Sequence, residues 1–171
     1  DETHYPDWHA DRLALQEQGI RLMSYINPFL VDLKEKPNVQ RDLFEEAKRF
    51  GYLVRSETGS PYAIGHTSFS TFMVDFTNQD ARQWFKDIVK EQVLGAGASG
   101  WMTDFGEALP CDAVLASEQS AAVYHNEYPV EWARLVDEAL AEAGANDVVP
   151  FHRSGFHRSP KYVRLFWLGD Q

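Results

Sequence analysis

The fold is decided at residues 100–107, which read Gly-Trp-Met-Thr-Asp-Phe-Gly-Glu. A short apolar run ends there in Asp104 and is followed by a glycine and by Glu107. This pattern is typical of a buried strand that delivers a carboxylate at its carboxyl end. A similar run, Leu-Phe-Trp-Leu-Gly-Asp-Gln at residues 165–171, leads to Asp170. The sequence therefore predicts two aspartates at strand ends.

Helices and strands alternate on both sides of this stretch. Apolar runs predict strands over residues 20–26, 101–104, 148–151 and 164–167, the first of them buried on both faces. Helical periodicity predicts helices over residues 11–18, 40–50, 80–94 and 130–143. Residues 52–75 hold a Gly-Ser-Pro turn between two β-rich runs and predict a small hairpin insertion. The alternation favours an α/β fold with a parallel sheet.

Composition sets limits on the class of protein. The chain has 171 residues, of which 44% are hydrophobic, which suits one folded domain. Its net charge of −10 argues against a nucleic-acid partner, and no apolar run is long enough to predict a membrane span. The single cysteine, Cys111, predicts neither an internal disulfide nor a zinc framework. A cytoplasmic enzyme fits these features, as do many other proteins.

Residues 95–100, Gly-Ala-Gly-Ala-Ser-Gly, match the spacing of a dinucleotide-binding loop. That motif needs a strand before it and a helix after it, so that the helix N-terminus meets the pyrophosphate. Here the predicted order is reversed, with a helix before and a strand after. The pattern therefore predicts a helix end and a tight loop.

The carboxyl ends of parallel strands meet at one mouth of an α/β barrel, where active sites lie. Asp104 and Asp170 could face each other there as the carboxylate pair of a retaining glycosidase, with carboxyl groups about 5–5.5 Å apart. Apolar neighbours of Asp170, such as Trp167, would raise its pKa by desolvation, as a general acid requires. The alternative is that both aspartates only cap turns.

Arg153 ends the strand that lies between those two. A guanidinium there could keep a carboxylate ionised and donate hydrogen bonds to sugar hydroxyls, although a structural ion pair is the alternative. His125, His152 and His157 lack the spacing of metal ligands, so no metal site is predicted.

These residues resemble glycoside hydrolase family 31, the retaining α-glycosidases. The resemblance is colinear over nearly the whole chain. Residues 19–28 resemble the family's third barrel strand, residues 101–107 its nucleophile strand and residues 167–170 its acid/base strand. Arg153-Ser154 resembles the arginine of its fifth strand. Within the family, the residues of these motifs are most similar to those of the sulfoquinovosidase subgroup, which releases 6-sulfo-glucose. Phe105-Gly106 and Gln171 favour that subgroup. His157-Arg158 departs from the subgroup's usual Thr-Gly.

The resemblance implies a partial (β/α)8 TIM barrel, comprising about strands three to six with their helices. It implies that residues 1–171 form a central part of a catalytic barrel that should be inactive on its own. Asp104 would be the nucleophile and Asp170 the acid/base, acting through a covalent glycosyl-aspartate with no cofactor or metal. Arg153, Trp101 and Trp167 would shape the pocket for a small-molecule glycoside.

Two alternatives to a sulfoquinovosidase stay open at this point. One is a neutral-sugar α-glucosidase or α-xylosidase of the same family. The other is a non-catalytic or sugar-binding chain. The subgroup's sulfonate-reading Arg-x-x-Trp motif is expected before Asp1, so these residues do not decide between sulfonated and neutral sugars.

Overall fold

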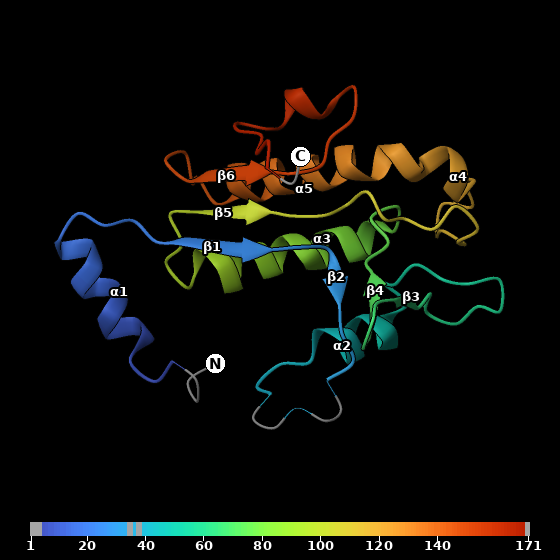
Figure 1. Ribbon diagram of the computed structural model, residues 1–171, viewed down its shortest axis with the longest axis horizontal. Coiled ribbons are helices and arrows are strands. Elements are labelled where there is room, and N and C mark those ends of the chain that lie inside the picture. Colours follow the sequence, from blue (N-terminus) through green and yellow to red (C-terminus); the bar gives the residue numbers. More distant parts are fainter. Residues whose placement is uncertain (1–4, 34–35, 37–38, 170–171) are drawn as a thin grey trace.

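The computed structural model describes residues 5–33, 36 and 39–169. Its centre is a parallel sheet of three strands in the order β1-β5-β6 (Figure 1). The strands are β1 Met23–Ile26, β5 Gly100–Thr103 and β6 Val149–His152. This sheet and the helices that connect its strands confirm the predicted α/β class, and the sheet does not close into a barrel within the chain.

The helices follow the predicted periodicity closely. Asn78 begins the helix predicted over residues 80–94, because its side-chain oxygen accepts a hydrogen bond from the backbone nitrogen of Asp80 at 2.9 Å. Gly51 ends the preceding helix in the left-handed conformation, with φ of 70°. The α-helices are α1 Trp8–Glu17, α2 Leu43–Phe50, α3 Gln79–Ile88, α4 Ala121–Tyr124 and α5 Tyr128–Glu142; α3 continues as a π-helix, η1 Val89–Leu94, and η2 His125–Glu127 and η3 Ser159–Lys161 are 3-10 turns.

A second, antiparallel sheet contains the predicted hairpin. Its strands are β2 Phe29–Leu30, β4 Ser70–Met73 and β3 Ile64–Gly65, in the order β2-β4-β3. The pairing of β2 with β4 was not predicted, because two residues are too few to show an alternating pattern. Through this pairing the hairpin is attached directly after β1, beside the carboxyl end of the parallel sheet (Figure 1).

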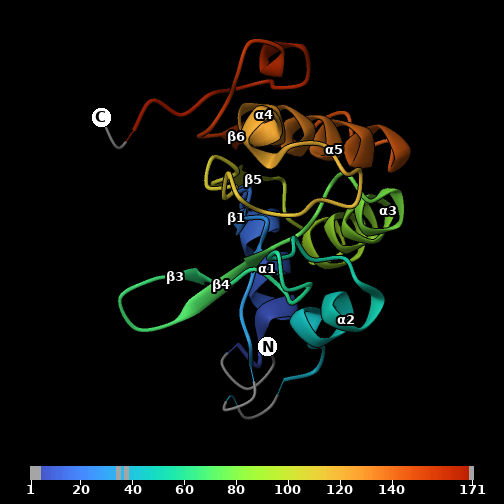
Figure 2. The same ribbon diagram turned by 90° about the vertical axis from the view of Figure 1, so that its right-hand side faces the viewer.

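Helices α3 and α5 cover one face of the parallel sheet, and no helix among the described residues covers the opposite face, which is called the open face below (Figure 2). Side chains alternate between the two faces along each strand. On the covered face Trp101 and His152 are buried, at 0% and 2% exposed. On the open face Met23, Tyr25 and Val149 are 53%, 50% and 42% exposed.

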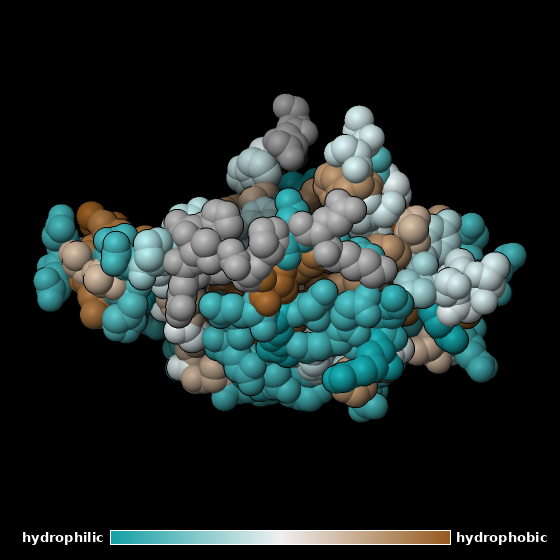
Figure 3. Space-filling model, turned by 90° about the horizontal axis from the view of Figure 1, so that it is seen from below, coloured by the Kyte–Doolittle hydropathy of each residue, from teal (hydrophilic) through white to brown (hydrophobic). Residues whose placement is uncertain are grey.

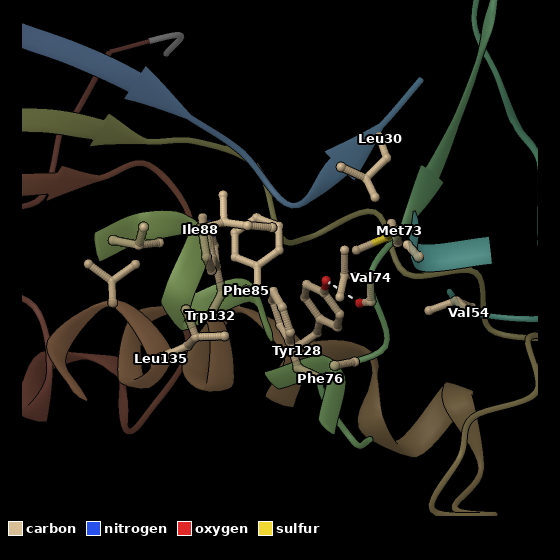
Figure 4. Packing of buried hydrophobic residues seen from close by; sticks show 14 of the residues in the cluster. Leu30, Val54, Met73, Val74, Phe76, Phe85, Ile88, Tyr128, Trp132 and Leu135 are labelled. Carbon is tan, nitrogen blue, oxygen red and sulfur yellow. Dashed lines mark hydrogen bonds between the residues drawn. The ribbon is translucent and has the colours of Figure 1, made fainter. Parts of the chain in front are cut away.

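The core fills the space between the covered face and the two long helices, and it continues to the second sheet, where Leu30 and Met73 belong to it (Figure 4). Phe76 stacks on Tyr128 and Trp132, with ring centroids 5.0 and 5.5 Å apart. The hydroxyl of the fully buried Tyr128 donates to the carbonyl of Val74 at 2.7 Å, which removes the cost of burying it. This cluster joins α5 to the segment before α3 and so fixes both helices against the sheet.

A network of ion pairs also joins α3 to α5. Arg82 is only 6% exposed and contacts Glu131 and Glu138, each at 3.1 Å. Lys86, one turn further along α3, pairs with Glu142. Because a buried guanidinium without a partner would be costly, this pairing also specifies how the two helices align.

Residues 95–99 join η1 to β5, so a helix precedes the glycine-rich stretch and a strand follows it, the order that argued against a dinucleotide site. A Cβ at Gly100 would overlap the carbonyl oxygen of Val149 and the side chain of Met23. This glycine is therefore explained by close packing of β5 between β6 and β1.

Two strand predictions were wrong in part. The run over residues 20–26 was expected to be buried on both faces, but the side chains of β1 are exposed or half-buried. β1 lies at the edge of the sheet, and burial depends on what covers a strand as well as on its own residues. The strand predicted over residues 164–167 is reduced to one parallel bridge between His152 and Phe166.

Helix α1 stands away from the parallel sheet (Figure 1) and buries none of its residues. Leu13 and Ile20 remain 41% and 47% exposed. Figure 3 shows apolar side chains exposed among polar ones at this end of the molecule. None of the helices in the described parts of the chain is both long enough and apolar enough to span a membrane.

Replacing Leu135 by alanine should lower the free energy of unfolding by about 2–5 kcal/mol, because the side chain is fully buried and its removal leaves a cavity. Urea denaturation followed by tryptophan fluorescence measures the change. Leu168→Ala is the matched control, since Leu168 is 75% exposed, and should change the free energy by less than about 0.5 kcal/mol. Equal effects of the two substitutions would contradict the assigned core.

Candidate active site

Asp104 lies at the carboxyl end of β5, where the sheet continues for one more residue. Its backbone nitrogen donates to the carbonyl of Ile26 at 2.9 Å. On the other side, the backbone nitrogen of Arg153 donates to the carbonyl of Thr103 at 3.4 Å. The ends of β1, β5 and β6 therefore meet at one edge of the sheet, as predicted for Asp104 and Arg153.

The Asp104 carboxylate is bound from both neighbouring strands. Its Oδ2 accepts a hydrogen bond from the hydroxyl of Tyr25, on β1, at 2.6 Å. Its Oδ1 accepts from Nε of Arg153, just after β6. The other end of the guanidinium, Nη2, donates to Oε1 of Glu107 at 2.6 Å. The Tyr25–Asp104–Arg153 cluster thus spans all three parallel strands, and Asp104 is only 7% exposed.

These contacts set the charge of each group. Burial raises the pKa of Asp104, but hydrogen bonds from Tyr25 and Arg153 to the ionised form outweigh it and hold that pKa below its ordinary value. Burial and the bond to Asp104 raise the pKa of Tyr25 to about 12. At neutral pH the cluster is therefore a carboxylate anion held by a neutral phenol and a guanidinium cation.

The backbone after Asp104 is strained. Phe105 has φ of 54°, a left-handed conformation that non-glycine residues rarely adopt, and Gly106 follows with φ of 110°. The Phe105 ring lies 4.6 Å below the Arg153 guanidinium and 5.2 Å from the ring of Phe29. Its carbonyl accepts from Oγ of Ser154 at 2.5 Å. Strained residues of this kind persist where surrounding contacts hold them, often at functional sites.

The carbonyl of Asp104 connects the site to the core. It accepts a hydrogen bond from Nε1 of the buried Trp132, on α5, at 3.2 Å. The same side chain lies 3.2 Å from the position of a Cβ added to Gly106. A bulky residue at Gly106 would therefore press on both the core and the strained turn.

The remaining predicted site residues fall elsewhere. Trp101 is three residues from Asp104, so it points to the opposite, helix-covered face and is fully buried. The prediction that it shapes a sugar pocket is corrected, because its ring is part of the core. Trp167 is 37% exposed, and its backbone nitrogen donates to the carbonyl of His152 at 2.8 Å. Asp170 lies outside the described residues.

The sequence alone indicates no role for two residues of the site, Glu107 and Tyr25. Glu107 stands in the motif that decided the fold, yet only the structure shows that it holds the far end of Arg153. Tyr25 lies on β1 opposite Met102, two residues before Asp104. Because Met102 and Asp104 are two residues apart on one strand, their side chains lie on the same face of the sheet, and Tyr25 shares that face. This deduction needs the register of the strands, which the sequence does not show.

The histidines considered for a metal are separate from one another. Nδ1 of His125 lies 2.6 Å from the carbonyl of Leu109, and burial lowers the pKa of His152 to about 4. Within the described ranges, no three His, Cys, Asp or Glu side chains come close enough together to hold a metal ion.

Known proteins share this fold and this arrangement of strands. Residues 1–171 match the model of the glycosyl hydrolases family 31 TIM-barrel domain. The sulfoquinovosidase of Escherichia coli (strain K12) is 36% identical over 169 residues, which are 98% of this chain and 24% of that protein. The chain therefore spans about a quarter of the length of this relative.

Two solved structures extend the comparison. A family 31 sulfoquinovosidase from E. rectale, in complex with the aza-sugar inhibitor IFGSQ, is 42% identical with a TM-score of 0.89. The match covers 97% of this chain and 24% of that one. A cycloalternan-degrading enzyme from Trueperella pyogenes, in complex with a covalent intermediate, is 28% identical with a TM-score of 0.81, over 96% of this chain and 23% of that one. This chain belongs to glycosyl hydrolase family 31 and forms part of its TIM-barrel domain.

Proposed function

We propose that residues 1–171 form the central part of the catalytic barrel of a retaining α-glycosidase, with residues 52–75 as an insertion. The observation that carries this proposal is the Asp104 carboxylate, kept ionised at the carboxyl end of a parallel sheet by Tyr25 and Arg153. An ionised carboxylate at that edge is what nucleophilic attack on a sugar requires.

The proposed reaction has two steps. In the first, an oxygen of Asp104 bonds to the anomeric carbon while the bond to the leaving oxygen breaks, and Asp170 gives that oxygen its proton. In the second, water attacks the anomeric carbon, Asp170 takes a proton from the water, and the Asp104 carboxylate is released. Arg153 donates to both Asp104 and Glu107, and its hydrogen bond helps to keep the Asp104 carboxylate ionised.

The proposed substrate is a sulfoquinovoside, and the product is sulfoquinovose. This proposal is supported by similarity to sulfoquinovosidases, both in sequence and among solved structures. Neutral α-glucosides and α-xylosides are the alternative, since the relatives of this chain include an alpha-xylosidase from Lactiplantibacillus pentosus that is 31% identical over 90% of this chain. A location in the cytoplasm stays a prediction of the sequence.

The test compares 4-nitrophenyl glycosides in the full-length natural protein that contains this chain. The sulfoquinovoside should be hydrolysed with a higher kcat/KM than the α-glucoside or the α-xyloside. The reverse preference would favour the neutral-sugar enzyme. Binding of the sugars with no turnover of any of them would favour a non-catalytic protein.

Asp104→Asn should lower turnover by at least roughly 10³-fold while substrate binding is kept, because the amide is nearly isosteric but cannot attack the anomeric carbon. Release of 4-nitrophenol measures turnover, and calorimetry measures binding. Asp147→Asn is the matched control: Asp147 precedes β6 at the other end of the sheet, and its side chain is 82% exposed. Comparable activity in the two variants would contradict the assigned nucleophile.

Asp170→Asn should slow glycosides with poor leaving groups more than activated aryl glycosides, because the latter need little protonation as they leave. A series of aryl sulfoquinovosides of increasing phenol pKa measures this, with the slope of log kcat/KM becoming steeper in the variant. An unchanged slope would exclude Asp170 as the acid.

A further inference from the structure

A chain of hydrogen bonds runs from the start of β2 to the Asp104 carboxylate. The backbone nitrogen of Phe29 donates to Oδ1 of Asn27 at 2.9 Å. Nδ2 of Asn27 donates to the hydroxyl of Tyr25 at 3.2 Å, and that hydroxyl donates to Oδ2 of Asp104 at 2.6 Å. Tyr25 lies on β1, Asn27 lies between β1 and β2, Phe29 begins β2, and Asp104 comes just after β5.

The donor and acceptor roles in this series of hydrogen bonds are fixed by its first donor, the backbone nitrogen of Phe29. A backbone N–H can only donate, so the side-chain oxygen of Asn27 must face Phe29 and its NH2 group must face Tyr25. The phenol accepts that bond with its oxygen, which leaves its single proton for Asp104. Tyr25 is therefore oriented as a donor to the carboxylate by the turn that follows β1.

Arg153 binds the other oxygen of the same carboxylate. Oδ2 is held from β1 and Oδ1 from the end of β6, so each oxygen has its own donor on its own side of β5. Rotation of the carboxylate about its terminal torsion would break both bonds. The plane of Asp104 is thus fixed by two strands, and not by the backbone of β5 alone.

We propose that Tyr25 is a positioning residue for the glycosidase reaction, which orients the Asp104 carboxylate and stabilises the negative charge that returns to it when the sugar is released. This inference rests on the proposed function. In the covalent intermediate Asp104 is a neutral ester, and in the second step it leaves as an anion. A donor already aimed at its oxygen stabilises that anion without reorganisation.

The groups that face Asp104 define how its ionisation responds to a change at Tyr25. From β1 it meets the Tyr25 phenol, from the end of β6 the Arg153 guanidinium, and Glu107 reaches it only through Arg153. The phenol stabilises the ionised form of Asp104, so its loss raises the pKa of that carboxyl. The acidic limb of kcat/KM should then move to higher pH, because the nucleophile becomes protonated sooner as pH falls.

The experiment replaces Tyr25 by phenylalanine in the full-length natural protein. With an activated aryl glycoside, kcat should fall about 10- to 100-fold, as expected for loss of a hydrogen bond to a charged group. KM should stay equal or fall, because slower release of the sugar lets the intermediate accumulate. The acidic limb should move up by about one pH unit.

Tyr62→Phe is the matched control. Tyr62 also donates to an aspartate, Oδ1 of Asp112, at 2.8 Å, but outside the Tyr25–Asp104–Arg153 cluster. It should leave kcat, KM and the acidic limb unchanged. If both phenylalanine variants lower kcat without moving the acidic limb, Tyr25 has only a structural role and the inference is overturned.

A second readout does not depend on activity. Carbon-13 labelling of aspartate carboxyl groups, with Asp104→Asn to identify the resonance, gives the pKa of Asp104 directly. That pKa should rise in Tyr25→Phe and rise less in Asn27→Ser, whose shorter side chain can accept from Phe29 but does not extend to the Tyr25 hydroxyl. An unchanged pKa in folded Tyr25→Phe overturns the inference. Absence of turnover in the unsubstituted protein overturns the proposed function, while this titration still tests the contact.

Discussion

The ion pair between Asp104 and Arg153 is the interaction on which the arrangement of the site depends. It joins the end of β5 to the end of β6, and through Tyr25 it reaches β1. Burial alone would raise the pKa of this carboxyl, and the hydrogen bonds from its partners bring that pKa below its ordinary value. The parallel sheet supplies the partners by bringing three strand ends to one edge. The geometry of the site therefore depends directly on the pairing of the three strands.

The strained turn after Asp104 shows how the core supports that edge. Phe105 takes a left-handed conformation while its ring contacts Arg153 and Phe29. Trp132 holds the carbonyl of Asp104 from the helix layer below. Strain at one residue is thus offset by contacts from β2, from β6 and from α5. The aromatic cluster that stabilises the helices also limits the positions that the carboxylate can take.

Much of this could be predicted from sequence because it depends on local patterns. The stripes of α3 and α5 and the strand that ends in Asp104 are encoded by neighbouring residues, and the carboxyl ends of parallel strands must meet. The pairing of β2 with β4 and the exposure of β1 depend on distant segments, so local patterns did not reveal them. Trp101 was misplaced because the family resemblance implied a sugar contact, whereas its odd spacing from Asp104 puts it on the other face. Tyr25 was missed because its contact with Asp104 depends on the register between β1 and β5.

The π-helical turn Val89–Leu94 has a consequence for how this segment can vary in length. A π-turn holds one more residue than an α-turn over the same stretch of axis. Insertion or deletion of a single residue there can be absorbed by interchange of the two kinds of turn. Such a change would leave Gly100 against Val149, and the strand that follows would not slip along its neighbours. The helix would thus allow the length of the chain to change at this point without a shift in the position of Asp104.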